Sequence, residues 1–262
     1  MQRTISIVLA LYLAQLLTDF VFQSSRLVAK KRQGAAGAYV WHGAIHLAWA
    51  LALVAFAWAG AFRDWLFYVA LVLLVLVHLL IDHAKLALVS SHAVKDGLGA
   101  FALDQILHAA TVLMAALAIA RMAPGSFVRH LAAVPLDREK ILGVLVVYAG
   151  IVWGGGYLLR YLTKPLTKRG LPEIQEGIDE LENAGLYIGW LERFVVVTAV
   201  VLRSPATVGF ILAAKSIARY PEFRSFRFAE YFLIGTLLSV SLGIMGGLLL
   251  LYFLQAPVLL TP

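Results

Sequence analysis

Long apolar runs separated by short polar connections dominate the pattern along the chain. Several runs are about twenty residues long, which is enough for a helix to cross the hydrocarbon core of a bilayer. The seventh run is short, and it is the one expected to be re-entrant. The pattern therefore predicts an all-α, polytopic helical membrane protein with about eight transmembrane or re-entrant helices, roughly at 4–23, 39–60, 66–89, 98–120, 141–160, 186–203, 205–219 and 229–254.

Composition agrees with this class of protein. Of the 262 residues, 61% are hydrophobic and 14% are charged, whereas a soluble domain carries about 25% charged residues. The formal charge of +7 is interpreted as basic connections that set membrane topology, so no nucleic-acid partner is expected. Cysteine is absent, which excludes a disulfide framework, cysteine metal ligands and a thiol nucleophile.

Three segments are predicted along the chain. Residues 1–125 form a four-helix membrane bundle, 126–185 hold span five and an amphipathic connector, and 186–262 form a three-helix membrane segment. Basic residues are more frequent on the side that holds connections 24–38 and 160–169. The positive-inside rule places that side in the cytoplasm and both termini outside.

Each of the first four spans carries two polar residues four positions apart. This spacing puts both members of a pair on one helical face. With alternating topology, all four pairs fall at the cytoplasmic end of the bundle. Ionisable groups inside a membrane are costly and usually mark a functional site. The pairs are Asp19 with Gln23, His42 with His46, His78 with Asp82, and Asp104 with His108.

Four histidines and three aspartates at one depth suit a divalent metal, with zinc as the expected ion. These ligands outnumber what one zinc needs, so either two metals bind or some residues orient the ligands. Asp19 or Asp82 is the candidate general base, and Lys85, three residues after Asp82, is placed to hold a developing oxyanion. The predicted metal ligands are His42, His46, His78, Asp82, Asp104 and His108.

Such a site predicts a metal-dependent hydrolase of a membrane lipid or an amphiphilic substrate. The alternatives are a proton- or cation-coupled transporter and a non-catalytic protein that binds a lipid or another ligand. A transporter should continue its polar positions across the membrane. Spans two to four become apolar beyond the cluster, as in WALALVAFAWAGA, and this favours a one-sided pocket.

The last three spans carry a second charged set. Its members fall toward the same side as the first cluster. One interpretation is an ion-pair network, and the other is a site for a phosphate or a lipid headgroup. Unpaired charges at that depth are costly, so the ion-pair interpretation is preferred. The set is Glu192, Arg193, Lys215, Arg219 and Glu230.

Several of these motifs resemble a known family. LLTDFVFQ, AKKR, HGAIH, HLLIDHAK and FALDQILH are similar to the bacterial membrane family called domain of unknown function 3307. GWLER, GFILAAKSIARY and AEYFLIGTLLSV resemble the segment that accompanies it in long members. The resemblance implies a multi-pass protein of the bacterial inner membrane and supplies no chemistry. A weaker likeness, in type of motif only, is to membrane-bound metal-dependent hydrolases. The motif positions are Asp19, Gln23, His42, His46, His78, Asp82, Asp104 and His108.

Overall fold

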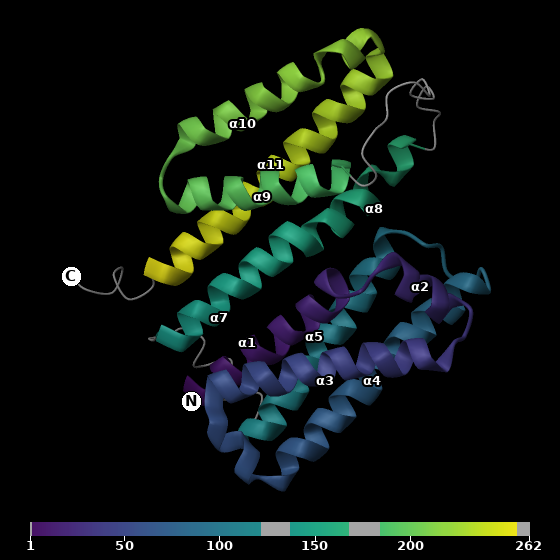
Figure 1. Ribbon diagram of the computed structural model, residues 1–262, viewed down its shortest axis with the longest axis vertical. Helices are drawn as coiled ribbons and strands as arrows, with labels where there is room; N and C mark the ends of the chain where they lie inside the picture. Colours follow the sequence, from purple (N-terminus) through teal and green to yellow (C-terminus); the bar gives the residue numbers. More distant parts are fainter. Residues whose placement is uncertain (1, 122–136, 168–183, 256–262) are drawn as a thin grey trace. The chain divides into compact units, whose positions relative to one another are not determined.

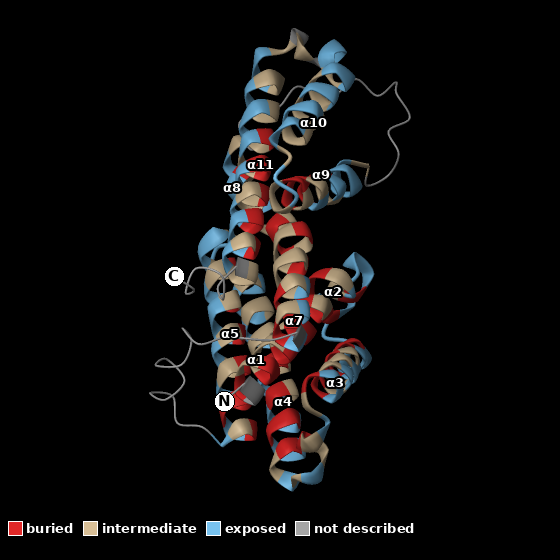
Figure 2. Cartoon of the chain, turned by 90° about the vertical axis from the view of Figure 1, so that its left-hand side faces the viewer, coloured by how far each residue is buried: buried red, intermediate tan, exposed pale blue. Residues whose placement is uncertain are grey.

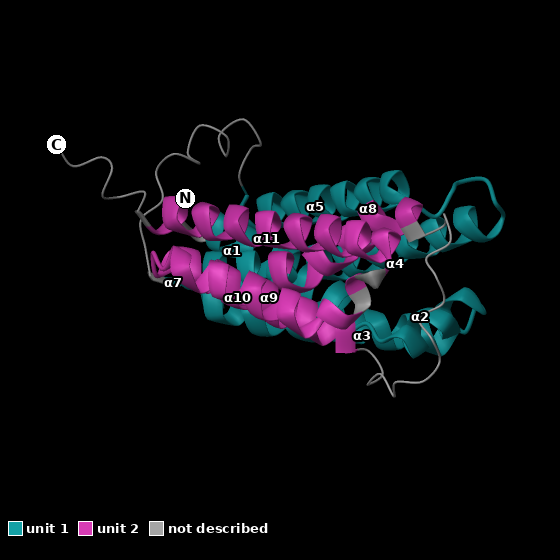
Figure 3. Cartoon of the chain, turned by 90° about the horizontal axis from the view of Figure 1, so that it is seen from above, with its two compact units in different colours: residues 1–149, 255–262 teal, residues 150–254 magenta. Residues whose placement is uncertain are grey.

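Helices form all the regular structure in the described part of the chain. The computed structural model describes residues 2–121, 137–167 and 184–255, and in these ranges it confirms the all-α prediction. The chain divides into two compact units, residues 1–149 with 255–262 and residues 150–254 (Figure 3). The predicted amphipathic connector lies almost wholly outside the described residues.

Seven helical segments in the described ranges are long and apolar enough to cross a membrane. The protein is therefore a multi-pass helical membrane protein. The expected seventh span corresponds to α10 (Pro205–Ala218), whose 14 residues extend only about 21 Å against a hydrocarbon core of about 30 Å. The seven long segments are Thr4–Val21, Ala36–Arg63, Trp65–Ser90, Leu98–Ala120, Arg138–Leu166, Ala184–Val201 and Phe226–Leu254.

The first unit is a bundle built around its N-terminal helix. In that helix 67% of the apolar span is buried, against 28–39% in the other spans, and Figure 2 colours the buried residues of the chain red. It packs against α3, α5 and α7. The elements are α1 (Gln2–Leu16), the π-helix η1 (Leu17–Val21), α2 (Ser25–Arg32), α3 (Ala36–Trp58), the 3-10 helix η2 (Ala59–Arg63), α4 (Trp65–Ser90), α5 (Leu98–Ala120) and α7 (Asp137–Tyr148) (Figure 1).

The packing of α7 on α1 explains why the first unit extends past residue 125, the end of the first segment expected from sequence. Ser6 of α1 donates a hydrogen bond to the Glu139 carboxylate of α7, and both side chains are buried. Span five therefore begins inside the first unit, and the boundary between units lies between Ala149 and Gly150.

The second unit relies on glycine for close helix packing. A Cβ atom at Gly243 would lie 2.7 Å from Val196 Cγ1, and one at Gly247 would lie 2.4 Å from Val200 Cβ. Small residues four positions apart are a common basis for such contacts in membranes. The elements are the π-helix η3 (Ala149–Gly154), α8 (Gly155–Thr167), α9 (Ala184–Val201), α10, the 3-10 helix η4 (Tyr220–Arg224) and α11 (Phe226–Gln255).

We expect Gly247→Ala to lower the free energy of unfolding by about 1–3 kcal/mol, the usual cost of overpacking. The added methyl group must displace the β-branched Val200 side chain or separate α9 from α11. Gly235→Ala on the same helix is the matched control, because a Cβ there meets nothing within 4 Å. Unfolding in detergent, followed by circular dichroism, measures the difference, and equal stability of the two variants would contradict it.

Candidate metal centre

Asp19 lies in a distorted turn at the end of the first span. The N–H of Phe22 donates to the carbonyl of Leu17 at 2.9 Å, five residues back, which is the hydrogen bond of a π-helix. Such single-turn π-helices are frequent at functional sites. The Asp19 side chain is buried, and its Oδ2 accepts a hydrogen bond from Gln15 Nε2 at 2.5 Å. Oδ1 has no hydrogen-bond partner among the described residues.

The histidines of α3 and α4 face the same point. His42 and His78 are fully buried, and their Nε2 atoms lie 2.9 Å apart. His42 Nε2 is also 3.3 Å from Asp19 Oδ1 and 3.3 Å from Asp82 Oδ2. Gly43 allows this approach, because a Cβ at that position would lie 3.0 Å from Leu79 Cδ1 of α4. Two ring nitrogens at this distance can share one proton or one cation.

The Nε2 atom of His108 on α5 faces the cluster without a hydrogen-bond partner among the described residues. Its Nδ1 lies 2.8 Å from the backbone carbonyl of Asp104 and 3.6 Å from the Asp104 Oδ1 atom. Both neighbours are acceptors, so Nδ1 carries the proton of the neutral ring. Nε2 is then the acceptor, and it is buried without a hydrogen bond, 3.8 Å from Asp82 Oδ1. This arrangement is how proteins orient a histidine that binds a metal.

His46 and Gln23 lie at the edge of the cluster. The fully buried His46 ring packs edge-on against His78, with ring centroids 4.5 Å apart. Neither of its nitrogens has a hydrogen-bond partner among the described residues. Gln23 is half-buried, and its Nε2 lies 3.5 Å from His42 Nε2. Both residues flank the ligand group described below.

The cation that pairs with Asp82 comes from α2, and Lys85 of α4 pairs with Asp104. Lys85 Nζ lies 2.8 Å from Asp104 Oδ2 on α5, the oxygen that also accepts from Gln105 Nε2 at 3.1 Å. The cation on Asp82 is Lys31, whose Nζ lies 2.5 Å from Asp82 Oδ2. Lys85 shares a helical face with Asp82, but its long side chain extends to the neighbouring helix.

Lys31 is the residue that sequence reasoning did not find. It belongs to the short helix α2, which begins after Ser24, whose hydroxyl accepts a hydrogen bond from the Leu27 N–H. Three of the four basic residues in this connection are exposed, whereas Lys31 is only 2% exposed. No sequence signal distinguishes it from the adjacent Lys30, because both stand in one basic run.

The donors in this cluster fit a divalent ion. One group of ligand atoms, from Asp19, His78, Asp82 and His108, lies within 4.8 Å of one another. His42 forms an overlapping group, in which five ligand–ligand distances run from 2.9 to 4.0 Å. A tetrahedral site with bonds of about 2.0–2.2 Å requires separations of about 3.3–3.6 Å.

Charge in the cluster also favours a cation. Three carboxylates, those of Asp19, Asp82 and Asp104, face two ammonium groups, those of Lys31 and Lys85. With neutral histidines the cluster carries one excess negative charge in a buried setting. Buried charges are costly unless they are paired or coordinate a metal. A metal ion would reduce that cost.

Three members of the C-terminal charged set, Glu192, Arg193 and Lys215, form contacts within the second unit. Lys215 Nζ lies 2.5 Å from the buried Glu192 carboxylate, as the ion-pair interpretation predicts. Arg193 instead donates to backbone carbonyls of η3, from Nε to Ile151 at 3.0 Å and from its second terminal nitrogen to Val152 at 2.7 Å. Arg219 is half-buried, and Glu230 is exposed.

Comparison with known proteins gives one result. Residues 7–131 match the family described as protein of unknown function (DUF3307). This part of the chain resembles that family. The match is somewhat under half of the chain, and all the candidate ligands lie inside it, whereas the C-terminal charged set lies outside it. No curated protein and no solved structure matches the chain.

Proposed function

We propose that this protein is a zinc-dependent hydrolase of the bacterial inner membrane, with its metal centre between the first four spans near the cytoplasmic face. The substrate is a membrane lipid or another amphiphile. The observation that carries the proposal is the buried, unpartnered Nε2 of His108, fixed as an acceptor by the bond from its Nδ1 and grouped with Asp19, His78 and Asp82.

The ligand set has a clear division of tasks. Asp19, His78, Asp82 and His108 would hold the ion and complete its fourfold coordination, so His42 is the surplus ligand. When bound, the ion supplies an activated water and polarises a carbonyl or phosphoryl oxygen. Ligands beyond the number that one zinc needs would serve a second ion or would orient the ligating rings.

These contacts change which carboxylate we propose as the general base. Asp19 has one oxygen in the ligand group and the other on Gln15, so a ligand role suits it better than the expected role of base. Asp104 Oδ1 is buried and has no hydrogen-bond partner among the described residues. This oxygen lies 3.6 Å from His108 Nδ1, on the side of the ring away from Nε2, so Asp104 would orient His108, and Asp82 is the remaining candidate base. Lys85 and Gln105 hold the other oxygen of Asp104, so Lys85 is a positioning residue.

A proton or cation path finds less support. On α1 a second buried polar pair, Ser6 with Glu139, lies toward the opposite end of the helix from Gln15 and Asp19. The nine residues from Ser6 to Gln15 correspond to a rise of about 13 Å. A relay should continue polar groups through this stretch. The half-buried Tyr12 is the one polar side chain in this stretch, and the buried positions between the two sites are Ile7, Ala10, Leu11, Leu13 and Ala14.

The test combines metal analysis with an activity screen on the same preparations. Protein purified without chelators should contain roughly one zinc per chain, and His108→Ala should retain less than about a tenth of that amount, because it removes a ligand. The wild type should release product from at least one member of a panel of phospholipids, lipopeptides and acyl esters, and His108→Ala should release none.

His83→Ala is the matched control. His83 is exposed and lies outside the cluster, with its Nδ1 3.1 Å from the Tyr39 hydroxyl, so this variant should keep both metal and activity. Equal zinc in the two variants would refute the metal centre. Stoichiometric zinc with no product from any substrate would refute the hydrolase and leave a non-catalytic metal protein.

A further inference from the structure

The short helix α2 has two faces of different character. Leu27 and Lys31, four positions apart, are buried where α2 packs against α3 and α4. Arg26, Lys30 and Arg32 are exposed, and none of the three forms an ion pair with a described residue. The helix therefore carries three cations that have no partner in the described part of the chain, all of them away from its buried face.

Helix energetics account for two of these cations but not for the third. Lys30 and Arg32 are in the last turn, where positive charge is favourable for the helix dipole. Arg26 is in the first turn, which contains no acidic residue, and positive charge there opposes the dipole. Arg26 also repels Lys30, because residues four positions apart are neighbours on a helix surface. An anion bound by Arg26 and Lys30 would relieve both effects.

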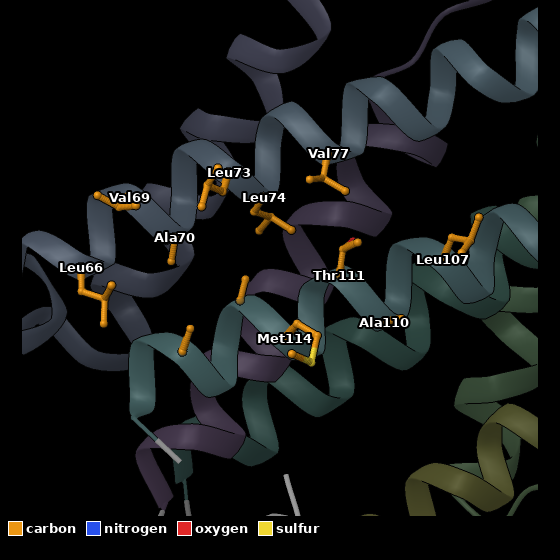
Figure 4. Close-up of a pocket in the computed structure, with 12 residues that line it drawn as sticks. Leu66, Val69, Ala70, Leu73, Leu74, Val77, Leu107, Ala110, Thr111 and Met114 are labelled. Carbon is orange, nitrogen blue, oxygen red and sulfur yellow. The ribbon is translucent and has the colours of Figure 1, made fainter. Parts of the chain in front are cut away.

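The depth of α2 in the membrane follows from its contact with α4. The residues of α4 that line a pocket against α5, from Leu66 to Val77, are all apolar (Figure 4). Asp82, the partner of Lys31, lies beyond this apolar stretch. From Trp65, where α4 begins, to Asp82 the rise is about 26 Å, close to the hydrocarbon thickness of about 30 Å. We therefore place α2 at the boundary between hydrocarbon and headgroups.

Exposed tryptophans agree with this depth. Trp41 is 63% exposed and lies in the second turn of α3, the helix that follows α2. Trp65 is 72% exposed and lies at the opposite end of the bundle, at the start of α4. Tryptophan is enriched at the two interfaces between membrane and water, at the level of the headgroups. Lipid phosphate groups are thus the anions that the exposed cations of α2 meet.

We propose that α2 binds the headgroups of anionic phospholipids through Arg26, Lys30 and Arg32, and that this binding holds Lys31 on Asp82. The inference goes beyond the proposed function, because it requires the pair of Lys31 with Asp82 and no bound metal. An anionic membrane surface raises the affinity of a nearby cation about fivefold. Three cations together would give a preference of roughly a hundredfold for an anionic surface over a neutral one.

Two magnitudes decide that the lipid holds α2 in place and does not withdraw it. Release of Lys31 would add a fourth cation to the lipid contact, a gain of about fivefold. It would also leave the Asp82 carboxylate, only 12% exposed, without its partner, a loss of roughly a hundredfold or more. An isolated helix of eight residues is not stable in water, so a released α2 would no longer keep Arg26 and Lys30 on neighbouring positions of one surface.

Hydrogen exchange in nanodiscs tests the proposal. The full chain is placed in nanodiscs of phosphatidylcholine alone or with roughly one third phosphatidylglycerol, and exchange of the amides of residues 25–32 is followed by mass spectrometry. We expect exchange at least about tenfold slower with phosphatidylglycerol, because the lipid stabilises the packed helix. Acetylation of the Lys31 amine should slow to a similar degree. Salt at about 1 M should remove both differences, because it screens the surface charge.

Two variants that lose the same charge make the result specific. Arg26→Gln combined with Lys30→Gln should reduce the difference between the two nanodiscs to about fivefold or less, the share of Arg32 alone. Arg63→Gln combined with Arg203→Gln removes two exposed cations outside α2 and should leave the difference unchanged. The comparison of wild-type protein in the two nanodiscs decides the proposal even if a variant does not fold.

Three outcomes would contradict the proposal. Equal exchange of wild-type protein in both nanodiscs would overturn it. Slower exchange in phosphatidylcholine nanodiscs after addition of inorganic phosphate would assign the cations to a soluble anion and overturn the lipid assignment. Faster acetylation of Lys31 with phosphatidylglycerol would show that the lipid withdraws α2 from Asp82, and it would overturn the coupling between the lipid and this ion pair.

Discussion

Replacing Lys31 with methionine should lower the free energy of unfolding of the metal-free protein by about 3–5 kcal/mol, because it leaves the Asp82 carboxylate, whose side chain is only 12% exposed, without its ammonium partner. Lys31 Nζ lies 2.5 Å from Asp82 Oδ2, and the lysine side chain is 1% exposed. Methionine keeps most of the apolar length of lysine, so the loss reports the charge rather than a cavity. Thermal unfolding in detergent with a chelator present measures the effect.

The same variant should recover stability when zinc is added, because the ion would neutralise Asp82 in place of the ammonium group. Lys30→Met is the matched control, since Lys30 is the exposed neighbour in α2 and an exposed charge contributes little. A loss of equal size in both variants would show that α2 tolerates no change of charge. A loss in Lys31→Met that zinc does not reverse would place the ion away from Asp82.

Arg193→Leu should cost about 1–3 kcal/mol for each of the two backbone carbonyls that lose their donor. The guanidinium group donates to Ile151 and Val152 within the π-helix η3. A π-helix alters the regular α-helical hydrogen bonds, and here the arginine serves carbonyls of the altered turn. Unfolding of the full chain in detergent measures the cost.

Two variants make this result specific. Arg193→Lys keeps the charge but not the forked donors, so we expect an intermediate loss. Arg160→Leu removes an exposed arginine from α8 in the same unit and should change stability by less than about 0.5 kcal/mol. If Arg193→Leu is no less stable than Arg160→Leu, the arginine has no part in holding η3.

Periodicity and depth could be predicted from the sequence. The apolar runs gave the seven long spans, and pairs four residues apart put polar side chains on the faces that meet in the first unit. His42, His78 and Asp82 lie within 4.0 Å of one another, because His78 and Asp82 share one face of α4 and His42 lies on the face of α3 that meets it. This part depends only on helical geometry and on the cost of exposing polar groups to lipid.

The rest depends on contacts that have no local signal. The choice of Lys31 over Lys30 is made by the packing of α2, and the choice of Asp104 as the partner of Lys85 is made by the reach of a flexible side chain across two helices. The π-helix that carries Asp19 has no recognised sequence mark in this chain. These details decide which residues bind a metal and which orient its ligands.

The π-helix η1 has a consequence for how the chain tolerates change in length. A five-residue turn contains one residue more than regular α-helical winding requires. Deleting one residue between Leu17 and Val21 would restore a regular α-helical turn and leave the residues after it in nearly their present directions, because the wider turn already absorbs the extra residue. Gln23, now 3.5 Å from His42, and α2 with Lys31 would stay close to α3, whereas the widened turn that carries Asp19 would be lost. One extra residue thus changes the direction of Asp19 without moving the basic helix that follows.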